Sequence, residues 1–148
     1  MQTLNLPIYK FRIKSNENKL FIFDILRKKY VSLTPEEWVR QHFVHYLIEE
    51  KNYPISLIGV EKKLTINGLT KRTDILVFNT NGEPHIIVEC KAPTIKINQA
   101  TFDQIARYNL KLQANYLIVT NGLDHFYCTM DFKNEQYQFL KDIPNFPQ

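Results

Sequence analysis

The chain is poor in cysteine, which removes several classes of protein from consideration. Cys90 and Cys128 are its only cysteines among 148 residues. Both lie in apolar, strand-like runs, and their spacing matches no zinc-binding pattern. We therefore expect two buried, free thiols in a reducing, cytoplasmic environment, and neither a disulfide framework nor a zinc site.

Long apolar runs and targeting features are absent as well. No stretch approaches the roughly 20 apolar residues that a transmembrane helix needs. Residues 1–7 lack the basic and apolar regions of a signal peptide. We therefore expect no association with a membrane.

Glycine is scarce too, with four residues, and repeats and low-complexity tracts are missing. The phosphate-binding pattern Gly-x-x-x-x-Gly-Lys-Ser/Thr does not occur, so no nucleotide-driven motor is expected in the chain. The length suits one domain with its own core. We predict a single domain over residues 1–148, in which 1–30 form an N-terminal hairpin extension and 141–148 an irregular tail.

The chain is mildly basic. Its formal net charge is +4, and its hydrophobic and charged fractions of 44% and 23% are ordinary for a soluble globular protein. This charge is compatible with binding to nucleic acid but does not require it.

Periodicity and turn residues predict an α/β protein. Thr34 and Pro35 begin a helix that runs to about Lys51, with Glu37 completing a capping box. Three strands joined by the turns Asn67-Gly68 and Asn81-Gly82 follow as an antiparallel meander. The remaining pattern predicts a helix, a strand buried on both faces, and two further strands. The predicted elements span residues 6–25 (a β-hairpin), 34–51, 56–66, 69–79, 85–91, 98–112, 115–120, 124–132 and 137–140.

Three charged residues interrupt the apolar strands of this meander. Asp74 precedes the run Ile-Leu-Val-Phe, and Glu89 and Lys91 end the run that starts at His85. Burying such charges is costly unless they are paired or bind a metal. A tight turn at Asn81-Gly82 pairs residues whose numbers sum to about 163, which places Asp74 opposite Glu89.

Two carboxylates in such proximity are stable mainly with a divalent cation between them. Oxygen-only ligation suits Mg²⁺, with Mn²⁺ as a substitute. Lys91 could then orient or deprotonate an attacking water, or stabilise a pentacovalent phosphate. The alternative is a structural salt bridge among Asp74, Arg72 and Lys91.

The first helix offers a third carboxylate. Glu36 lies on the same side as the apolar residues Val39 and Phe43, whereas Glu37 is off that side and has a capping role. Geometry therefore favours Glu36 over Glu37 as the residue that faces the site. Stabilisation of the helix dipole by both glutamates is the alternative.

At these residues the sequence resembles the PD-(D/E)xK nuclease superfamily, and more narrowly the N-terminal domains of type I restriction enzyme R proteins. The resemblance covers roughly residues 20–125, with Thr73 where the motif name has proline. The matching segments are 33–41 (Leu-Thr-Pro-Glu-Glu-Trp-Val-Arg-Gln), 71–77 (Lys-Arg-Thr-Asp-Ile-Leu-Val), 87–93 (Ile-Val-Glu-Cys-Lys-Ala-Pro), 104–109 (Gln-Ile-Ala-Arg-Tyr-Asn) and 116–122 (Tyr-Leu-Ile-Val-Thr-Asn-Gly).

The resemblance implies a restriction-endonuclease-like α-β-β-β-α-β core with a mixed central sheet. It implies that Asp74 and Glu89 hold Mg²⁺, that Lys91 is the catalytic lysine, and that a glutamate of the first helix, Glu36 or Glu37, completes the site. Gln104 and Tyr108 match a Gln-x-x-x-Tyr element of some members. These two side chains project from one helical face, where Gln104 could orient Lys91 or a phosphate and Tyr108 could buttress it.

These observations favour a Mg²⁺-dependent DNA endonuclease of restriction or repair type. One alternative is a DNA-binding module or accessory subunit that does not cut, and another is an interaction protein with a purely structural salt bridge. Lys62, Lys63 and Lys96 are candidate phosphate contacts, and Tyr108 is a further candidate nucleic-acid-binding residue. Solvated surface is the alternative for each of them, and for a lysine considered alone it is the default. A homodimer or a larger restriction-like complex is expected, because double-strand cleavage favours two sites.

Overall fold

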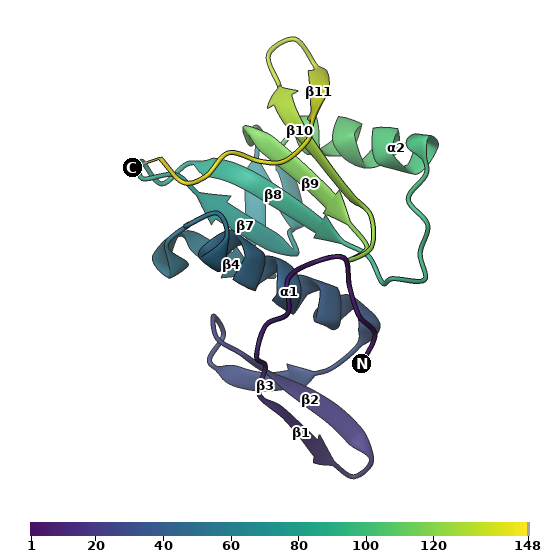
Figure 1. Cartoon of the computed structure of the whole chain (residues 1–148). Helices are drawn as coiled ribbons and strands as arrows, with labels where there is room; N and C mark the ends of the chain where they lie inside the picture. The colour runs from purple at the N-terminus through teal and green to yellow at the C-terminus, as the bar shows by residue number, and fades with distance from the viewer. Residues whose placement is uncertain (148) are drawn as a thin grey trace.

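The computed structural model describes residues 1–147 and shows a mixed β-sheet with one helix on each face, together with a smaller sheet at one end (Figure 1). The helices are α1 (Pro35–Glu49) and α2 (Gln99–Leu110), and a short 3₁₀ turn spans Ile55–Leu57. The strands are β1 (Ile13–Asn16), β2 (Lys19–Asp24), β3 (Lys29–Ser32), β4 (Ile58–Val60), β5 (Lys63–Ile66), β6 (Leu69–Arg72), β7 (Ile75–Phe78), β8 (Pro84–Cys90), β9 (Tyr116–Thr120), β10 (His125–Asp131) and β11 (Gln136–Leu140).

The six-stranded sheet confirms the predicted fold class. Its strand order is β11-β10-β9-β8-β7-β4, with β8 and β9 parallel and the other neighbours antiparallel. The parallel pair is connected through α2, as a strand–helix–strand crossover requires. The predicted order α-β-β-β-α-β with a mixed central sheet is therefore present.

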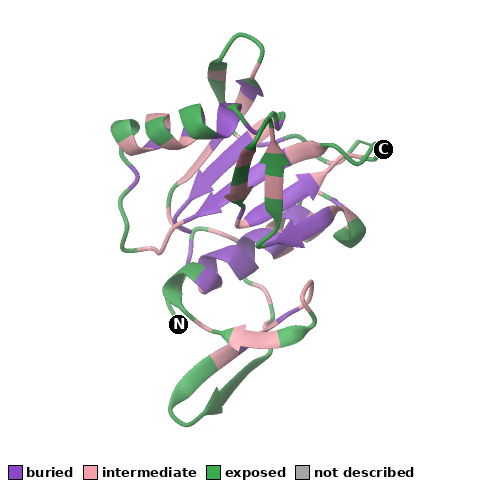
Figure 2. Ribbon diagram, turned by 180° about the vertical axis from the view of Figure 1, so that it is seen from behind, coloured by how far each residue is buried: buried purple, intermediate pink, exposed green. Residues whose placement is uncertain are grey.

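Each face of this sheet packs against one helix. Val88 and Cys90 belong to the core that includes Val39 and Phe43 of α1. Ile87, on the opposite face of β8, belongs to the core that α2 covers. Because neighbouring strand residues face opposite sides, Glu89 shares the α2 side with Ile87. Figure 2 shows the continuous buried surface of the central strands between the two layers.

The start of α1 agrees with the prediction except in one detail. Thr34 caps the helix, because its hydroxyl accepts a hydrogen bond from the Glu37 backbone N–H at 3.0 Å. The reciprocal half of the capping box is absent, since the Glu37 carboxylate instead binds Arg27, Arg40 and Gln41. The charge of these basic partners attracts the carboxylate away from the helix terminus.

The two long strands predicted for residues 56–66 and 69–79 are each broken in the middle. The first bends at Glu61, which has a positive φ of 51°, and the second is interrupted between Arg72 and Ile75. Backbone hydrogen bonds bridge the break, from Thr73 N–H to the Lys62 carbonyl at 2.8 Å and from Glu61 N–H to the Asp74 carbonyl at 3.1 Å. As a result, β5 and β6 leave the main sheet and form a two-stranded hairpin.

The N-terminal segment also differs from the prediction. The strand expected from residue 6 begins only at Ile13, and β3 forms between the predicted hairpin and the first helix, where no strand was predicted, so the extension is a three-stranded antiparallel sheet. This sheet lies on the side of α1 opposite the main sheet (Figure 1). Alternation over residues 6–12 did not suffice for a strand because no neighbouring strand pairs with that segment.

Three simpler expectations can be compared directly with the structure. Cys90 and Cys128 are both free and buried, as predicted. Within residues 1–147, no helix is long and apolar enough to cross a bilayer. Residues 141–147 form no helix or strand, although Ile143 is buried against the core.

Candidate active site

The register of β7 and β8 places the start of β7 beside the end of β8, as the turn at Asn81-Gly82 predicted. Ile75 pairs with Val88 and Val77 with Ile86, which confirms the predicted pairing. Asp74 directly precedes β7, and its Oδ2 atom accepts a hydrogen bond from the Cys90 backbone N–H at 2.7 Å. The Asp74 carboxylate is thus fixed next to the last residues of β8.

A buried arginine of α1 holds the other oxygen of Asp74. The Arg40 guanidinium lies 3.2 Å from Asp74 Oδ1, and it also contacts Glu36, Glu37 and Glu61 at 3.5, 2.9 and 3.3 Å. The alternative ion pair of Asp74 with Arg72 or Lys91 is absent among the described residues. Arg40 therefore neutralises Asp74 from the α1 side of the sheet.

The two glutamates at the start of α1 occupy different environments. The Glu37 side chain is 8% exposed and pairs with Arg27 and Arg40, both at 2.9 Å. The Glu36 side chain is 48% exposed, and burial together with the Asp74 charge raises its pKa, while Arg40 and Lys91 act in the opposite direction. Glu36 is therefore the glutamate that borders Asp74 and Lys91.

Glu89 faces the α2 side and has a different basic partner. The Lys71 ammonium, which comes from the β5–β6 hairpin, forms an ion pair with Glu89 Oε1. The same ammonium lies 5.0 Å from the ring centroid of Tyr108 on α2. Burial lowers the pKa of Lys71, the Asp74 charge raises it and the Lys91 charge lowers it further. The ends of β7 and β8 thus carry two acids, each with its own cation.

Lys91 follows β8 directly, where the chain leaves the sheet. Its backbone N–H donates to the Thr120 carbonyl at 2.8 Å, which continues the β8–β9 pairing by one residue. Its side chain is half-buried and makes no ion pair within residues 1–147. Its charge acts on the pKa values of Glu36 and of Lys71, lowering both.

The other predicted site residues differ in whether they contact the charged residues at the ends of β7 and β8. Tyr108 reaches them through Lys71, whereas Gln104, one turn earlier on α2, is exposed and makes no side-chain hydrogen bond in the part of the chain that the structure describes. Lys62 and Lys63 are exposed where β4 gives way to β5, and Lys96 is exposed in the loop after Lys91. The structure does not attach these three lysines to the carboxylates.

Arg40 and Lys71 were missed by reasoning from the sequence. Arg40 could have been found, because it follows Glu36 by four residues and so shares its helical face. For Lys71 no local pattern was available, since its contact with Glu89 depends on the bend that separates β6 from β7.

The carboxylates are not gathered into a ready-made metal cage. Among residues 1–147, no three His, Cys, Asp or Glu side chains form a group that could hold a metal ion. The charges around the site nevertheless leave an excess of two negative charges, because six carboxylates face four basic side chains. These are Asp24, Glu36, Glu37, Glu61, Asp74 and Glu89 on one side, and Arg27, Arg40, Lys71 and Lys91 on the other.

That charge balance and the donor chemistry fit a divalent cation. Carboxylate oxygens are the ligands that Mg²⁺ and Mn²⁺ prefer. Asp74 and Glu89, with Glu36 next to Asp74, are the residues that would hold the ion. Arg40 and Lys71 neutralise Asp74 and Glu89 in this structure and would have to release them.

A groove of about 500 Å³ leads to these residues from the N-terminal sheet. Its lining includes Val31 and Ser32 of β3, Glu36 and Arg40 of α1, and Ala92. Since Ala92 follows Lys91 directly, the groove opens next to the candidate catalytic lysine.

A mixed sheet between two helices, with two carboxylates and a lysine at the ends of adjacent strands, defines a restriction-endonuclease-like domain. The chain belongs to the family of type I restriction enzyme R protein N termini (HSDR_N), whose model matches residues 35–144. The chain is also similar to a solved structure from Anabaena variabilis, described as a suspected nuclease of the DUF820 family. That likeness has 14% identity and a TM-score of 0.48, and covers 93% of this chain and 80% of the other. A search of curated proteins found no match.

Proposed function

We propose that this domain is a Mg²⁺-dependent endonuclease of restriction or repair type that hydrolyses phosphodiester bonds of DNA. One observation carries the proposal: Asp74 and Glu89 lie at the ends of paired strands, Lys91 directly follows the second of these strands, and Glu36 contacts the same Arg40 guanidinium as Asp74. Membership of a restriction enzyme family supports the same conclusion.

The residues of the site would have different roles in hydrolysis. Asp74, Glu89 and Glu36 would hold the ion, and the Cys90 N–H fixes the orientation of Asp74. Bound Mg²⁺ supplies a Lewis acid and lowers the pKa of water, and Mn²⁺ would substitute for it. The Lys91 ammonium, which has no carboxylate partner among residues 1–147, can donate hydrogen bonds to the attacked phosphate or position the attacking water.

Substitution of Lys91 tests this proposal. We expect Lys91→Ala to reduce Mg²⁺-dependent nicking of a plasmid by about 10²-fold or more, which is typical of the loss of an acid–base or charge-stabilising group. Lys133→Ala is the matched control, because Lys133 is an exposed lysine in the β10–β11 turn. Cleavage by Lys91→Ala at the rate of the unchanged protein would refute the catalytic role.

A second candidate function is supported by the ion pairs themselves. Arg40 and Lys71 already neutralise Asp74 and Glu89, as would be expected in a DNA-binding module or accessory subunit that does not cut. This alternative predicts salt-dependent DNA binding that is the same with Mg²⁺ and with EDTA, and no cleavage with either Mg²⁺ or Mn²⁺.

Cleavage of both strands would favour two sites, so we propose a homodimer or a larger restriction-like complex on DNA in the cytoplasm. Sedimentation of the protein with a duplex oligonucleotide measures this directly. A complex that contains one chain per duplex at saturating protein would contradict the dimer.

A further inference from the structure

The positive charge of the protein is concentrated in its first 34 residues. This segment contains seven basic residues and two acidic residues, whereas residues 35–148 contain twelve basic and thirteen acidic residues. The whole excess of +4 therefore comes from the segment that precedes the family match at residues 35–144. The N-terminal sheet β1–β3 thus lies outside the part of the chain that matches the family, and it differs from that part in electrostatic character.

Little of this charge is used inside the protein. Asp24 is buried and pairs with Arg27 at 2.5 Å, and Arg27 also binds Glu37 and Glu61. Only Glu17 remains to oppose the other basic residues of the segment. These are exposed and make no ion pair within residues 1–147: Lys10, Arg12, Lys14, Lys19, Lys28 and Lys29.

The sheet has one buried face and one basic, aromatic face. Ile22 and Asp24 point inward and are 0% and 1% exposed. The register places Phe21 between Lys14 and Ser32 on the opposite face. Because strand side chains alternate, Lys19 and Phe23 lie on that outer face as well, and Tyr30 is the partner of Phe23. We call this surface the outer face of β1–β3.

Aromatic rings hold two of its cations in place. The Arg12 guanidinium lies 4.3 Å from the ring centroid of Phe23, and the Lys14 ammonium lies 4.1 Å from that of Tyr30. These cation–π contacts order the side chains without neutralising their charge. The outer face therefore presents ordered positive charges, which an anionic partner can bind.

The outer face is continuous with the candidate active site. Ser32, which shares this face with Lys14 and Phe21, also lines the groove that contains Glu36, Arg40 and Ala92. DNA bound on the outer face would therefore lie beside this groove, in which Arg40 pairs with the carboxylates of Glu36, Glu37 and Glu61. A compact anion would not need a face of this extent.

We propose that the outer face of β1–β3 binds the phosphate backbone of the DNA that flanks the cleaved bond. This inference rests on the proposed nuclease function and assigns it a substrate-binding surface. Regularly spaced phosphates match a face with several cations and almost no acids, and each phosphate contact releases a counterion. Arg12 and Lys14 are the central contacts.

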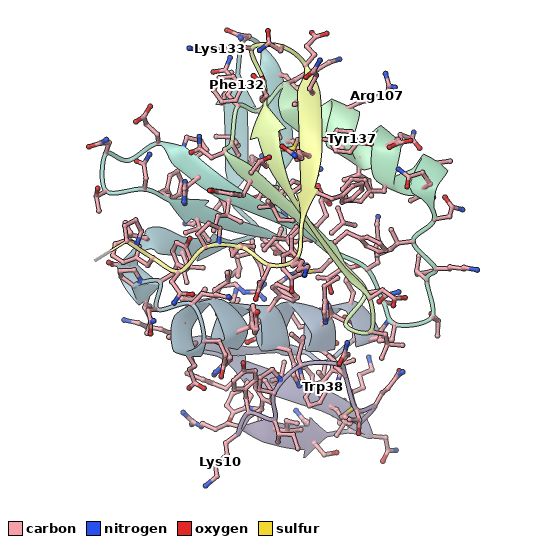
Figure 3. The ribbon with its side chains drawn as sticks, turned by 45° about the horizontal axis from the view of Figure 1, so that its top comes forward. Lys10, Trp38, Arg107, Phe132, Lys133 and Tyr137 are labelled. Carbon is pink, nitrogen blue, oxygen red and sulfur yellow. The ribbon has the colours of Figure 1, made fainter. Side chains whose placement is uncertain are left out.

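Binding to a fluorescent duplex oligonucleotide in EDTA tests this surface independently of cleavage. The double variant Arg12→Gln/Lys14→Gln should bind about tenfold more weakly at 0.1 M salt, and its salt dependence should fall by about two phosphate contacts. Lys19→Gln, which removes a third cation of the outer face and leaves both cation–π contacts intact, should act in the same direction. The control Arg107→Gln/Lys133→Gln removes equal charge at the far end of the molecule from Lys10 (Figure 3).

Several outcomes would overturn the proposal: unchanged binding by the Arg12 and Lys14 variant, an equal loss in the control, or capture of the protein by phosphatidylserine vesicles but not by DNA. Weaker binding by the variant, together with no cleavage by the unchanged protein in Mg²⁺, would support the surface while contradicting the nuclease function. Cleavage by the unchanged protein with full binding by the variant would contradict the surface alone.

Discussion

The Arg40 guanidinium lies 3.2 Å from the Asp74 carboxylate, although the two residues come from the first helix and from the break between β6 and β7. The same buried guanidinium also contacts Glu36, Glu37 and Glu61. One cation therefore connects α1, the bend at the end of β4 and the candidate active site. Nearby negative charge outweighs burial and raises the pKa of Arg40, so this charge is permanent.

Removal of Arg40 should destabilise the fold. Arg40→Met leaves Glu37 buried with fewer counter-charges, and loss of one partner of a buried ion pair typically costs about 3–5 kcal/mol. The free energy of unfolding from urea denaturation measures this cost. Arg40→Lys, which retains the charge, is the control and should lose less. A loss below about 1 kcal/mol in Arg40→Met would mean that water enters and solvates the carboxylates.

Replacement of Lys71 should strengthen metal binding. Lys71→Gln removes the ammonium that pairs with Glu89, so a divalent cation no longer competes with it for that carboxylate. We expect the affinity for Mn²⁺, measured by titration calorimetry, to rise about tenfold, which corresponds to about 1.4 kcal/mol. Lys63→Gln removes an exposed charge from the same hairpin and should have little effect. Weaker Mn²⁺ binding by Lys71→Gln would show that Lys71 supports the metal site instead of competing for it.

The raised pKa of Glu36 predicts a pH-dependent effect on stability. A carboxyl whose pKa is raised by folding favours the folded state below its ordinary value of 4.5, and this contribution is lost as the pH rises through the folded-state value. In EDTA, Glu36→Gln should therefore match the unchanged protein at pH 3.5 and exceed it at pH 7, by less than about 1 kcal/mol because the group is half-exposed. Urea denaturation across this range measures the difference.

A second substitution identifies the cause of that effect. The Asp74 charge contributes to the shift after burial, so the gain from Glu36→Gln should be smaller in an Asp74→Asn background. A gain that is the same at pH 3.5 and pH 7 would contradict the assignment.

Both thiols should be unreactive in the folded protein. Burial raises the pKa of Cys128 to about 12, and burial together with the Asp74 charge raises the pKa of Cys90 well above its ordinary value. The reactive thiolate is therefore scarce at pH 8. Ellman's reagent should label neither cysteine under native conditions and both in guanidinium chloride. Rapid labelling of one native thiol would indicate local opening of its strand.

The sequence was most informative where short-range geometry decides the structure. The turn at Asn81-Gly82 determines the register of its hairpin, so the proximity of Asp74 to the end of β8 could be predicted from residue numbers. The cap at Thr34 and the apolar face of α1 are equally local features. The order of elements that these features predict is the one that the structure shows.

Features that depend on distant partners could not be predicted in this way. The third strand of the N-terminal sheet requires β2 as a partner, and residues 6–12 alternate without finding one. The Lys71–Glu89 ion pair depends on the bend at Glu61. The positive φ of this residue could not be predicted, because the position is not occupied by a glycine. Burial of Arg40 likewise requires carboxylates from three separate segments, which only the folded chain brings together.

The break between β6 and β7 separates the β5–β6 hairpin from the main sheet. Lys71 is on the hairpin and Glu89 is on the main sheet, and the chain connects the two parts of the meander at 61–62 and 73–74. Leu64 and Leu69 of the hairpin pack against the core that α2 covers. The tip at Gly68 borders a hollow of about 580 Å³ that Arg107 of α2 also lines, so the hairpin that holds Lys71 against Glu89 also forms one wall of this hollow.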